Sequence, residues 1–213
     1  GQNIHQTIMN LITILESTLQ KALWLKPIWS KTISCIHHLE KQTKKNNIDR
    51  DFAGAISSFL NLGFESLNTE GKNSFDSAFM YFFLILEAIS KQVIDEDNFH
   101  KVTYTNKFNK TMTGYKFQFR SNYNFLKEFE GNDYMQVGIG DDLISGNKRI
   151  PYNAKFHNLI SYAGIQGDDP ISLVKLRNRF NHPNLVKNRR LAVIEKEHVD
   201  KIFEICDKLI DKL

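Results

Sequence analysis

The stretch FDSAFMYFFLILEAISKQ (residues 75–92) is the most apolar helical pattern in this chain of 213 residues. Its large apolar side chains recur at four- and three-residue spacing: Phe75, Phe79, Phe82, Leu86, Ile89 and Val93, with Met80, Phe83 and Ile85 on the flanks. This spacing predicts an α-helix, and a helix apolar around so much of its circumference is expected to be central and buried. Glu87 interrupts the apolar surface. A buried carboxylate needs a partner, and a structural ion pair or cap is the expected role.

Further helical patterns lie on both sides of this stretch. They cover approximately residues 4–22, 27–44, 49–67, 153–162, 170–182 and 196–213. Pro27 suits the start of the second of these helices, because proline is favoured in a first turn. The Asp168-Asp169-Pro170 sequence supplies an acidic cap and a first-turn proline in the same way. These patterns predict an all-α fold.

One segment departs from the helical pattern. Residues 101–127 are rich in aromatic and basic side chains and contain no acid, and YKFQFR at 115–120 alternates strictly. Period-two alternation predicts a strand, so the helical bundle is expected to carry a small β-hairpin insertion around 101–125. The expected organisation is a set of amino-terminal helices (1–70) and a core (71–213) with its insertion at 100–150, together forming a single domain.

Composition indicates a soluble globular protein. Hydrophobic residues make up 41% and charged residues 24% of the chain, and the net charge is +4. The longest apolar run, Ala78–Leu86, is much shorter than the ~20 residues that span a membrane, so no membrane partner is expected. Cys35 and Cys206 lie among apolar neighbours and are expected to be buried free thiols, which favours a reducing, cytoplasmic location. The scattered histidines form no metal-ligand pattern.

The stretch LVKLRNRFNHPNLV (173–186) holds the candidate site. Asn178 and His182 are four residues apart and share a helix face, while Arg177 and His182 are about 140° apart. Pro183 disfavours helical geometry at His182, so the helix is expected to end there. Residues 175–190 contain six Lys or Arg and no acid, which attracts phosphate.

These residue types suit cleavage of RNA without a metal ion. Histidine can take or give a proton near neutral pH, and arginine can hold a phosphate and stabilise developing charge. Asparagine can orient either of them, and RNA supplies its own 2′-hydroxyl nucleophile. The residues alone also fit a purely structural role, because cations and asparagine favour helix carboxyl ends.

The segment Arg177-Asn178-Arg179-Phe180-Asn181-His182 resembles the R-[polar]-x3-H signature of the HEPN superfamily, whose members are all-α domains and include many ribonucleases. Residues 75–92 are similar to the buried helix of HEPN effectors in type III CRISPR systems, with Leu86-Glu87 at the matching place. Asn181 and Pro183 stand where that family often has a small residue and a glycine. The effectors' amino-terminal α/β sensor domain has no counterpart in these patterns.

The resemblance implies a homodimeric, metal-independent endoribonuclease that cuts single-stranded RNA in antiviral, CRISPR-type or toxin-type defence. His182 would be the acid/base, Arg177 would bind the phosphate and Asn178 would position both. A fused or separate regulatory sensor domain, or an antitoxin, is a further expected partner, and no cofactor is expected.

RNA-binding roles are expected for basic side chains near the motif and on the exposed side of the hairpin: Lys175, Arg179, Lys116 and Arg120. An alternative for the hairpin is that its aromatic face fills the core while its basic face is merely solvated. The alternative for the whole chain is a catalytically silent HEPN-like dimerisation or RNA-binding module. An enzyme requires Arg177 and His182 to be exposed in a shared cleft.

Overall fold

The computed structural model of the chain describes residues 2–69, 71, 74–105, 108–119, 156, 159, 170–181 and 193–213. Its elements are the helices α1 (Gln2–Lys44), α2 (Arg50–Asn68), α3 (Ser74–Val93), α5 (Pro170–Asn181) and α6 (Lys196–Asp211), and the strands β1 (Ile94–Thr105) and β2 (Thr111–Phe119). The described residues are mostly helical, with a single two-stranded antiparallel sheet. The predicted all-α fold with one hairpin is therefore confirmed.

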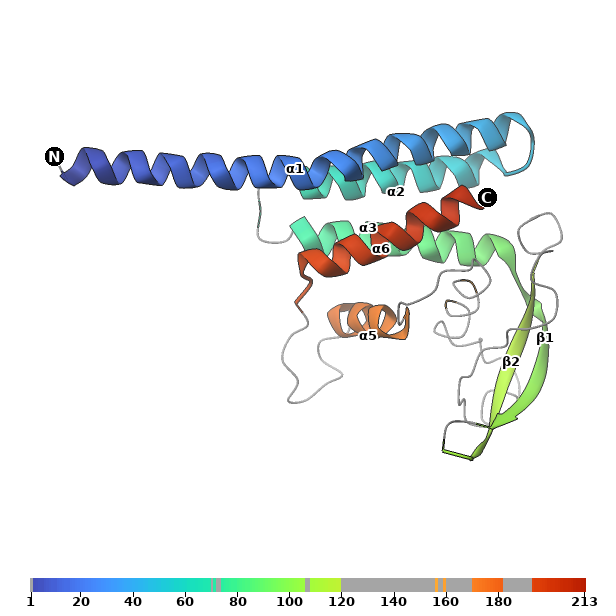
Figure 1. Ribbon diagram of the computed structural model, residues 1–213. Helices are drawn as coiled ribbons and strands as arrows, with labels where there is room; N and C mark the ends of the chain where they lie inside the picture. The colour runs from blue at the N-terminus through green and yellow to red at the C-terminus, as the bar shows by residue number, and fades with distance from the viewer. Residues whose placement is uncertain are drawn as a thin grey trace.

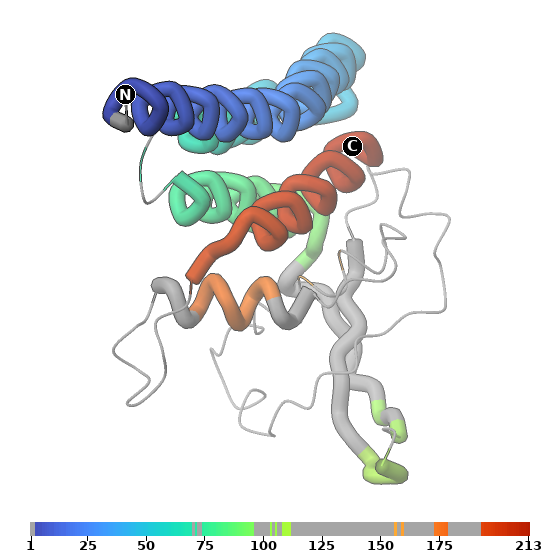
Figure 2. Tube along the Cα trace, turned by 60° about the vertical axis from the view of Figure 1, so that its left-hand side comes forward, coloured from blue at the N-terminus to red at the C-terminus, as the bar shows by residue number. Residues whose placement is uncertain are grey.

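The helices are arranged in layers. Figure 1 shows α1 and α2 side by side, α3 and α6 beneath them, and α5 below that pair. The turned view in Figure 2 keeps the same order. α3 contacts both α2 and α6, and α1 contacts α2 and α6, so α3 occupies the centre as its sequence predicts. One hydrophobic core joins residues from both predicted halves, from Leu25 in α1 to Leu209 in α6.

α2 and α3 approach closely at a glycine. Gly63 of α2 is buried, and a Cβ atom added to it would lie 2.8 Å from Cζ of Phe82. The Phe82 ring is fully buried and also packs against Phe203 of α6, with 5.1 Å between ring centroids. Gly63 thus leaves the space in which the Phe82 ring links three helices.

α1 corrects the prediction of two separate helices at 4–22 and 27–44. It is one continuous helix, and Pro27 lies inside it rather than at a start. A proline inside a helix removes one backbone hydrogen bond, at a cost of about 3 kcal/mol. Leu23, the residue whose carbonyl loses that bond, is 63% exposed. Burial of Leu25 and Ile28 on either side of Pro27 holds the helix together.

The hairpin also begins earlier than predicted. β1 starts at Ile94, directly after Val93 ends α3, whereas the insertion was expected from about residue 101. Antiparallel pairing continues from Ile94 opposite Phe119 to Thr105 opposite Thr111, with an irregularity between Asp95 and Phe99. Residues 94–100 have no strand pattern of their own; pairing with β2 makes them a strand. The alternating side chains at 115–120 lie outside the described side chains.

The helix ends follow their local sequence. Asp49 caps α2, since its Oδ1 accepts hydrogen bonds from the backbone N–H groups of Asp51 at 2.9 Å and Phe52 at 3.0 Å. α5 begins at Pro170, as predicted from the acidic pair before it. α6 begins at Lys196 and buries the apolar stripe that its sequence predicts. Of the helix predicted at 153–162, only Phe156 and Leu159 are described; both are helical and buried.

Candidate functional site

α5 carries the described part of the motif and is held to the bundle by its apolar side. Leu173 and Val174 are buried in the core, and Leu176 packs against it. Lys175 and Asn178 are exposed. The amphipathic pattern of α5 therefore fixes which residues of the motif face the bundle and which face solvent.

Arg177 is paired with Glu87 of α3. Its Nη2 donates to Oε1 of Glu87 at 2.7 Å, and the two side chains are only 24% and 19% exposed. The guanidinium also lies over the ring of Phe83, with its Cζ 5.6 Å from the ring centroid. Its Nη1 donates to Oδ1 of Asn178 at 3.1 Å. A charge-assisted hydrogen bond and a cation–π contact together fix the arginine over α3.

Arg177 is the partner that the Glu87 carboxylate was expected to need. The prediction of an ion pair is confirmed, and its partner is the arginine expected to act on RNA. The two residues are 90 positions apart in the chain, so the sequence did not identify them as partners. The signal was present, however: a carboxylate inside an apolar helix requires a cation from a neighbouring element.

The structure describes the other predicted site residues only in part. Lys175 is exposed on α5, and the backbone of Arg179 belongs to the same helix. Lys116 pairs with His100 across the hairpin. The side chains of Arg179 and Lys116 lie outside the described ones, as do His182 and Arg120 entirely. The structure thus brings together Arg177 and Asn178, adds Glu87, and leaves the distance to His182 undescribed.

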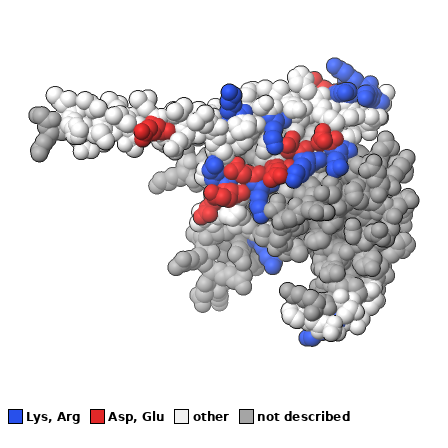
Figure 3. All heavy atoms as spheres, in the orientation of Figure 1, with Lys and Arg blue, Asp and Glu red and all other residues white. Residues whose placement is uncertain are grey.

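Charge on the described surface does not form a basic patch over α6. Figure 3 shows Lys, Arg, Asp and Glu side chains intermixed there. Two of the ion pairs lie along the helix at i,i+4 spacing: Lys196 with Asp200 at 3.7 Å, and Lys208 with Glu204 at 2.8 Å. Mixed charges of this kind keep a surface solvated and do not concentrate phosphate.

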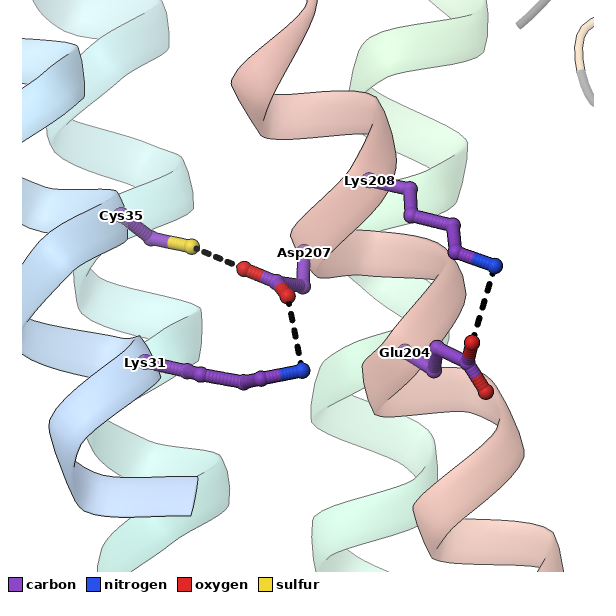
Figure 4. Close-up of polar contacts among 5 residues, drawn as sticks. All are labelled: Lys31, Cys35, Glu204, Asp207 and Lys208. Carbon is purple, nitrogen blue, oxygen red and sulfur yellow. Dashed lines mark hydrogen bonds and ion pairs between the residues drawn. The ribbon is translucent and has the colours of Figure 1, made fainter. Parts of the chain in front are cut away.

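Both cysteines are buried free thiols, as predicted. Figure 4 shows Cys35 of α1 pointing to Asp207 of α6, with Sγ 3.4 Å from Oδ1, while Lys31 holds the other carboxylate oxygen at 3.1 Å. Burial, followed by the charge of Asp207, raises the pKa of the Cys35 thiol from 9.0 to about 12. Burial likewise raises the pKa of Cys206, which donates to the Phe82 carbonyl at 3.2 Å. Neither thiol is suited to act as a nucleophile.

We expect the thiols to resist modification in the folded protein. At pH 8 a disulfide reagent such as DTNB should label them on the order of 100-fold more slowly than in denaturant, because the thiolate is the reactive form. Since the folded pKa of Cys35 exceeds the unfolded one, stability present below pH 9 should decline as pH rises from 9.0 to about 12. Denaturant titrations at several pH values, with Cys35→Ala beside the unchanged chain, measure this. An equally steep decline in the variant would contradict it.

Two further observations bear on what the chain binds. Within the described ranges, His, Cys, Asp and Glu residues form no cluster of three that could hold a metal ion. Likewise, none of the helices described here is both long and apolar enough to span a membrane.

Comparison of the chain with protein-family models, with curated proteins and with solved structures finds no match. The HEPN resemblance therefore rests on the motif and on the stretch at 75–92.

The Glu87–Arg177 ion pair should stabilise the folded protein. Glu87→Gln and Arg177→Met should each lower the free energy of unfolding by about 1–3 kcal/mol, because each leaves a mostly buried charge without its ion partner. The double variant should lose less than the sum of the two, by about 1 kcal/mol or more. Urea titrations of the four proteins measure this coupling.

The exposed pair Glu204–Lys208 supplies the control for this cycle. It has a similar distance, 2.8 Å, but both side chains are about half exposed. Its coupling should be only ~0.3–0.5 kcal/mol. Equal coupling in the two cycles would mean that Glu87 and Arg177 do not form a protected pair.

Proposed function

We propose that this chain is a metal-independent endoribonuclease of HEPN type that cuts single-stranded RNA as a homodimer, acting in the cytoplasm in a defence or toxin role. Its site would consist of Arg177, Asn178 and His182. The observation that carries the proposal is the fixed position of Arg177 near the carboxyl end of α5, five residues before His182. The exposure expected for an enzyme is met only in part, since 24% of the Arg177 side chain is accessible.

The chemistry assigned to each residue follows from its type. His182 would take the proton from the 2′-hydroxyl, whose oxygen then attacks the neighbouring phosphorus. The bond to the 5′-oxygen breaks, and that oxygen receives a proton from the His182 of the second copy. The products are a 2′,3′-cyclic phosphate and a 5′-hydroxyl. Arg177 would stabilise the charge that develops on the phosphate oxygens.

Glu87 would serve this reaction as a positioning residue. Its carboxylate fixes the guanidinium at 2.7 Å, and the contact with Phe83 limits the side chain further. An arginine already restricted to one arrangement loses less conformational entropy when it binds phosphate. Lys175, exposed two residues before Arg177, would add attraction for the RNA backbone.

The second candidate is a catalytically silent module. It is favoured by the same ion pair, because an arginine that serves only to join α5 to α3 would have this partner and this burial. The two functions differ in what the protein does to RNA.

The test is incubation of the purified chain with labelled single-stranded RNA in excess EDTA. The proposed enzyme should release fragments that end in a 2′,3′-cyclic phosphate. Absence of cleavage at concentrations where the protein is dimeric would favour the silent module.

A further inference from the structure

The amino-terminal half of α1 extends beyond the bundle. Figures 1 and 2 show it projecting past the ends of the other helices. Most of its large apolar side chains face solvent; Ile4, Leu11 and Leu15, for example, are 69%, 54% and 67% exposed. Soluble proteins rarely leave so long an apolar surface uncovered unless something binds to it.

These side chains form a regular stripe. Ile8, Leu15, Ala22 and Trp29 recur every seven residues, with Ile4 four residues before Ile8 and Leu11 between Ile8 and Leu15. This is the heptad pattern by which two helices pair in a coiled coil. We refer to these six residues as the α1 stripe.

The α1 stripe leads into the face that packs on the bundle, because Leu25, Thr32 and Leu39 follow Ile4 and Leu11 at seven-residue spacing and are buried. The buried residues of α1 are Leu25, Ile28, Thr32, Cys35 and Leu39. Leu25 and Trp29 are four residues apart, so they lie about 40° apart on neighbouring parts of one side of the helix. Trp29 remains 44% exposed although it contacts Phe64 of α2. The large apolar side chains from Ile4 to Leu23 are therefore uncovered by the described bundle, and the bundle begins to cover α1 at Leu25.

The near-absence of charge on the projecting part of α1 indicates which kind of partner would bind there. Between Gln2 and Gln20, Glu16 is the only Asp, Glu, Lys or Arg, and the side opposite the stripe carries mostly amides and hydroxyls. In Figure 3 the projecting part of α1 is almost entirely uncharged. Helices that lie on membrane surfaces typically carry Lys and Arg on the polar face, which this one lacks. A charged protein partner would likewise find little to pair with.

The exposed apolar area of α1 supplies more than half of the area that a stable interface buries on each partner. Eight large side chains contribute, namely the stripe's Ile4, Ile8, Leu11, Leu15 and Trp29 with the flanking Ile12, Leu19 and Leu23. At roughly 100 Å² for each fully exposed side chain, they offer on the order of 500 Å² of apolar surface per copy. Stable interfaces bury about 800 Å² per partner in total, polar flanks included.

We propose that the α1 stripe is a homodimerisation surface, on which the same helix of a second copy binds. An uncharged helix can pair with itself without like-charge repulsion. The inference rests on the homodimer of the proposed function and names the surface that would form it. Its readout is molecular mass rather than RNA cleavage. A dimer that survives the stripe substitutions would overturn this inference alone, and a dimer that does not cleave RNA would overturn the proposed function alone.

The test is sedimentation equilibrium at micromolar concentrations. The unchanged chain should have twice the mass of the 24.8 kDa monomer. Leu11→Glu combined with Leu15→Glu should weaken dimerisation at least 100-fold, because four carboxylates would enter one seam. Leu11→Ala with Leu15→Ala should weaken it to an intermediate degree.

The matched control adds the same charges to the polar face. Thr13→Glu with Ser17→Glu has the same four-residue spacing on the same exposed helix and should leave the dimer intact. All variants should keep the thermal unfolding midpoint of the bundle within a few degrees. A monomeric unchanged chain, or a dimeric Leu11→Glu/Leu15→Glu variant, would overturn the proposal. So would a monomer that floats with neutral phosphatidylcholine vesicles, which would assign the stripe to a membrane surface.

Discussion

His182→Ala should abolish RNA cleavage while leaving the fold intact. General acid/base catalysis contributes about 10²–10⁴-fold to a rate, and here the same histidine from each copy would supply both proton transfers. The loss should therefore be at the upper end of that range. The substituted position follows the last described residue of α5, Asn181, and precedes a proline, so its helical contribution to stability is small.

The measurement is a time course of cleavage of labelled RNA in excess EDTA. His37→Ala is the matched control, because His37 is an exposed histidine of α1 with only a weak partner, Glu40 at 3.8 Å. It should cleave at the unchanged rate. If His182→Ala retained full activity, the acid/base would be another group and the motif would lose its assigned role.

Arg177→Lys adds a sharper form of the same test. Lysine keeps the charge, and so can still pair with Glu87, but it lacks the planar fork that binds two phosphate oxygens at once. Cleavage should fall by at least 10-fold while the unfolding midpoint changes little. A variant that lost stability but not activity would instead assign Arg177 to the structure alone.

Gly63→Ala should destabilise the fold by about 1–3 kcal/mol, although alanine favours helices more than glycine does. The added Cβ would lie 2.8 Å from Cζ and 2.9 Å from Cδ1 of Phe82. Phe82 has no room to move, because its fully buried ring also packs against Phe203. Either the ring leaves its rotamer or α2 moves away from α3.

Gly54→Ala is the control on the same helix. A Cβ at Gly54 would meet nothing within 4 Å, so only the helix preference applies. This variant should be more stable by up to about 1 kcal/mol. Urea titrations of both variants should give changes of opposite sign. Equal, stabilising changes would mean that α2 and α3 are not in contact at Gly63.

Periodic patterns predicted the parts of the fold that depend on local sequence. The buried α3 followed from its spacing, and the helices α2 and α6 followed from the patterns at 49–67 and 196–213. Two predictions were wrong where distant contacts outweigh local preference. Pro27 suggested a helix start, but burial of its neighbours keeps α1 continuous. Residues 94–100 suggested no strand, but pairing with β2 makes one.

The candidate site was predictable only one residue at a time. The motif identified Arg177 and Asn178, and an apolar helix identified Glu87 as a carboxylate in need of a cation. Their meeting depends on how α5 packs against α3, since 90 positions separate Arg177 from Glu87. No periodicity within either helix contains that information. The assignment of His182 to catalysis remains a prediction for the cleavage assay.

α3 passes directly into β1 without an intervening loop, so the hairpin continues from the end of that helix. Val93 and Ile94, on either side of the junction, are both fully buried and clamp its base. β1 has 12 residues, so its outer end lies about 40 Å along the strand from that clamp. A molecule that binds at the tip of the hairpin, where Phe108 is 70% exposed, would therefore pull on α3 from a long distance. α3 also carries Glu87, the ion partner of Arg177, so the hairpin and the arginine site are attached to the same helix.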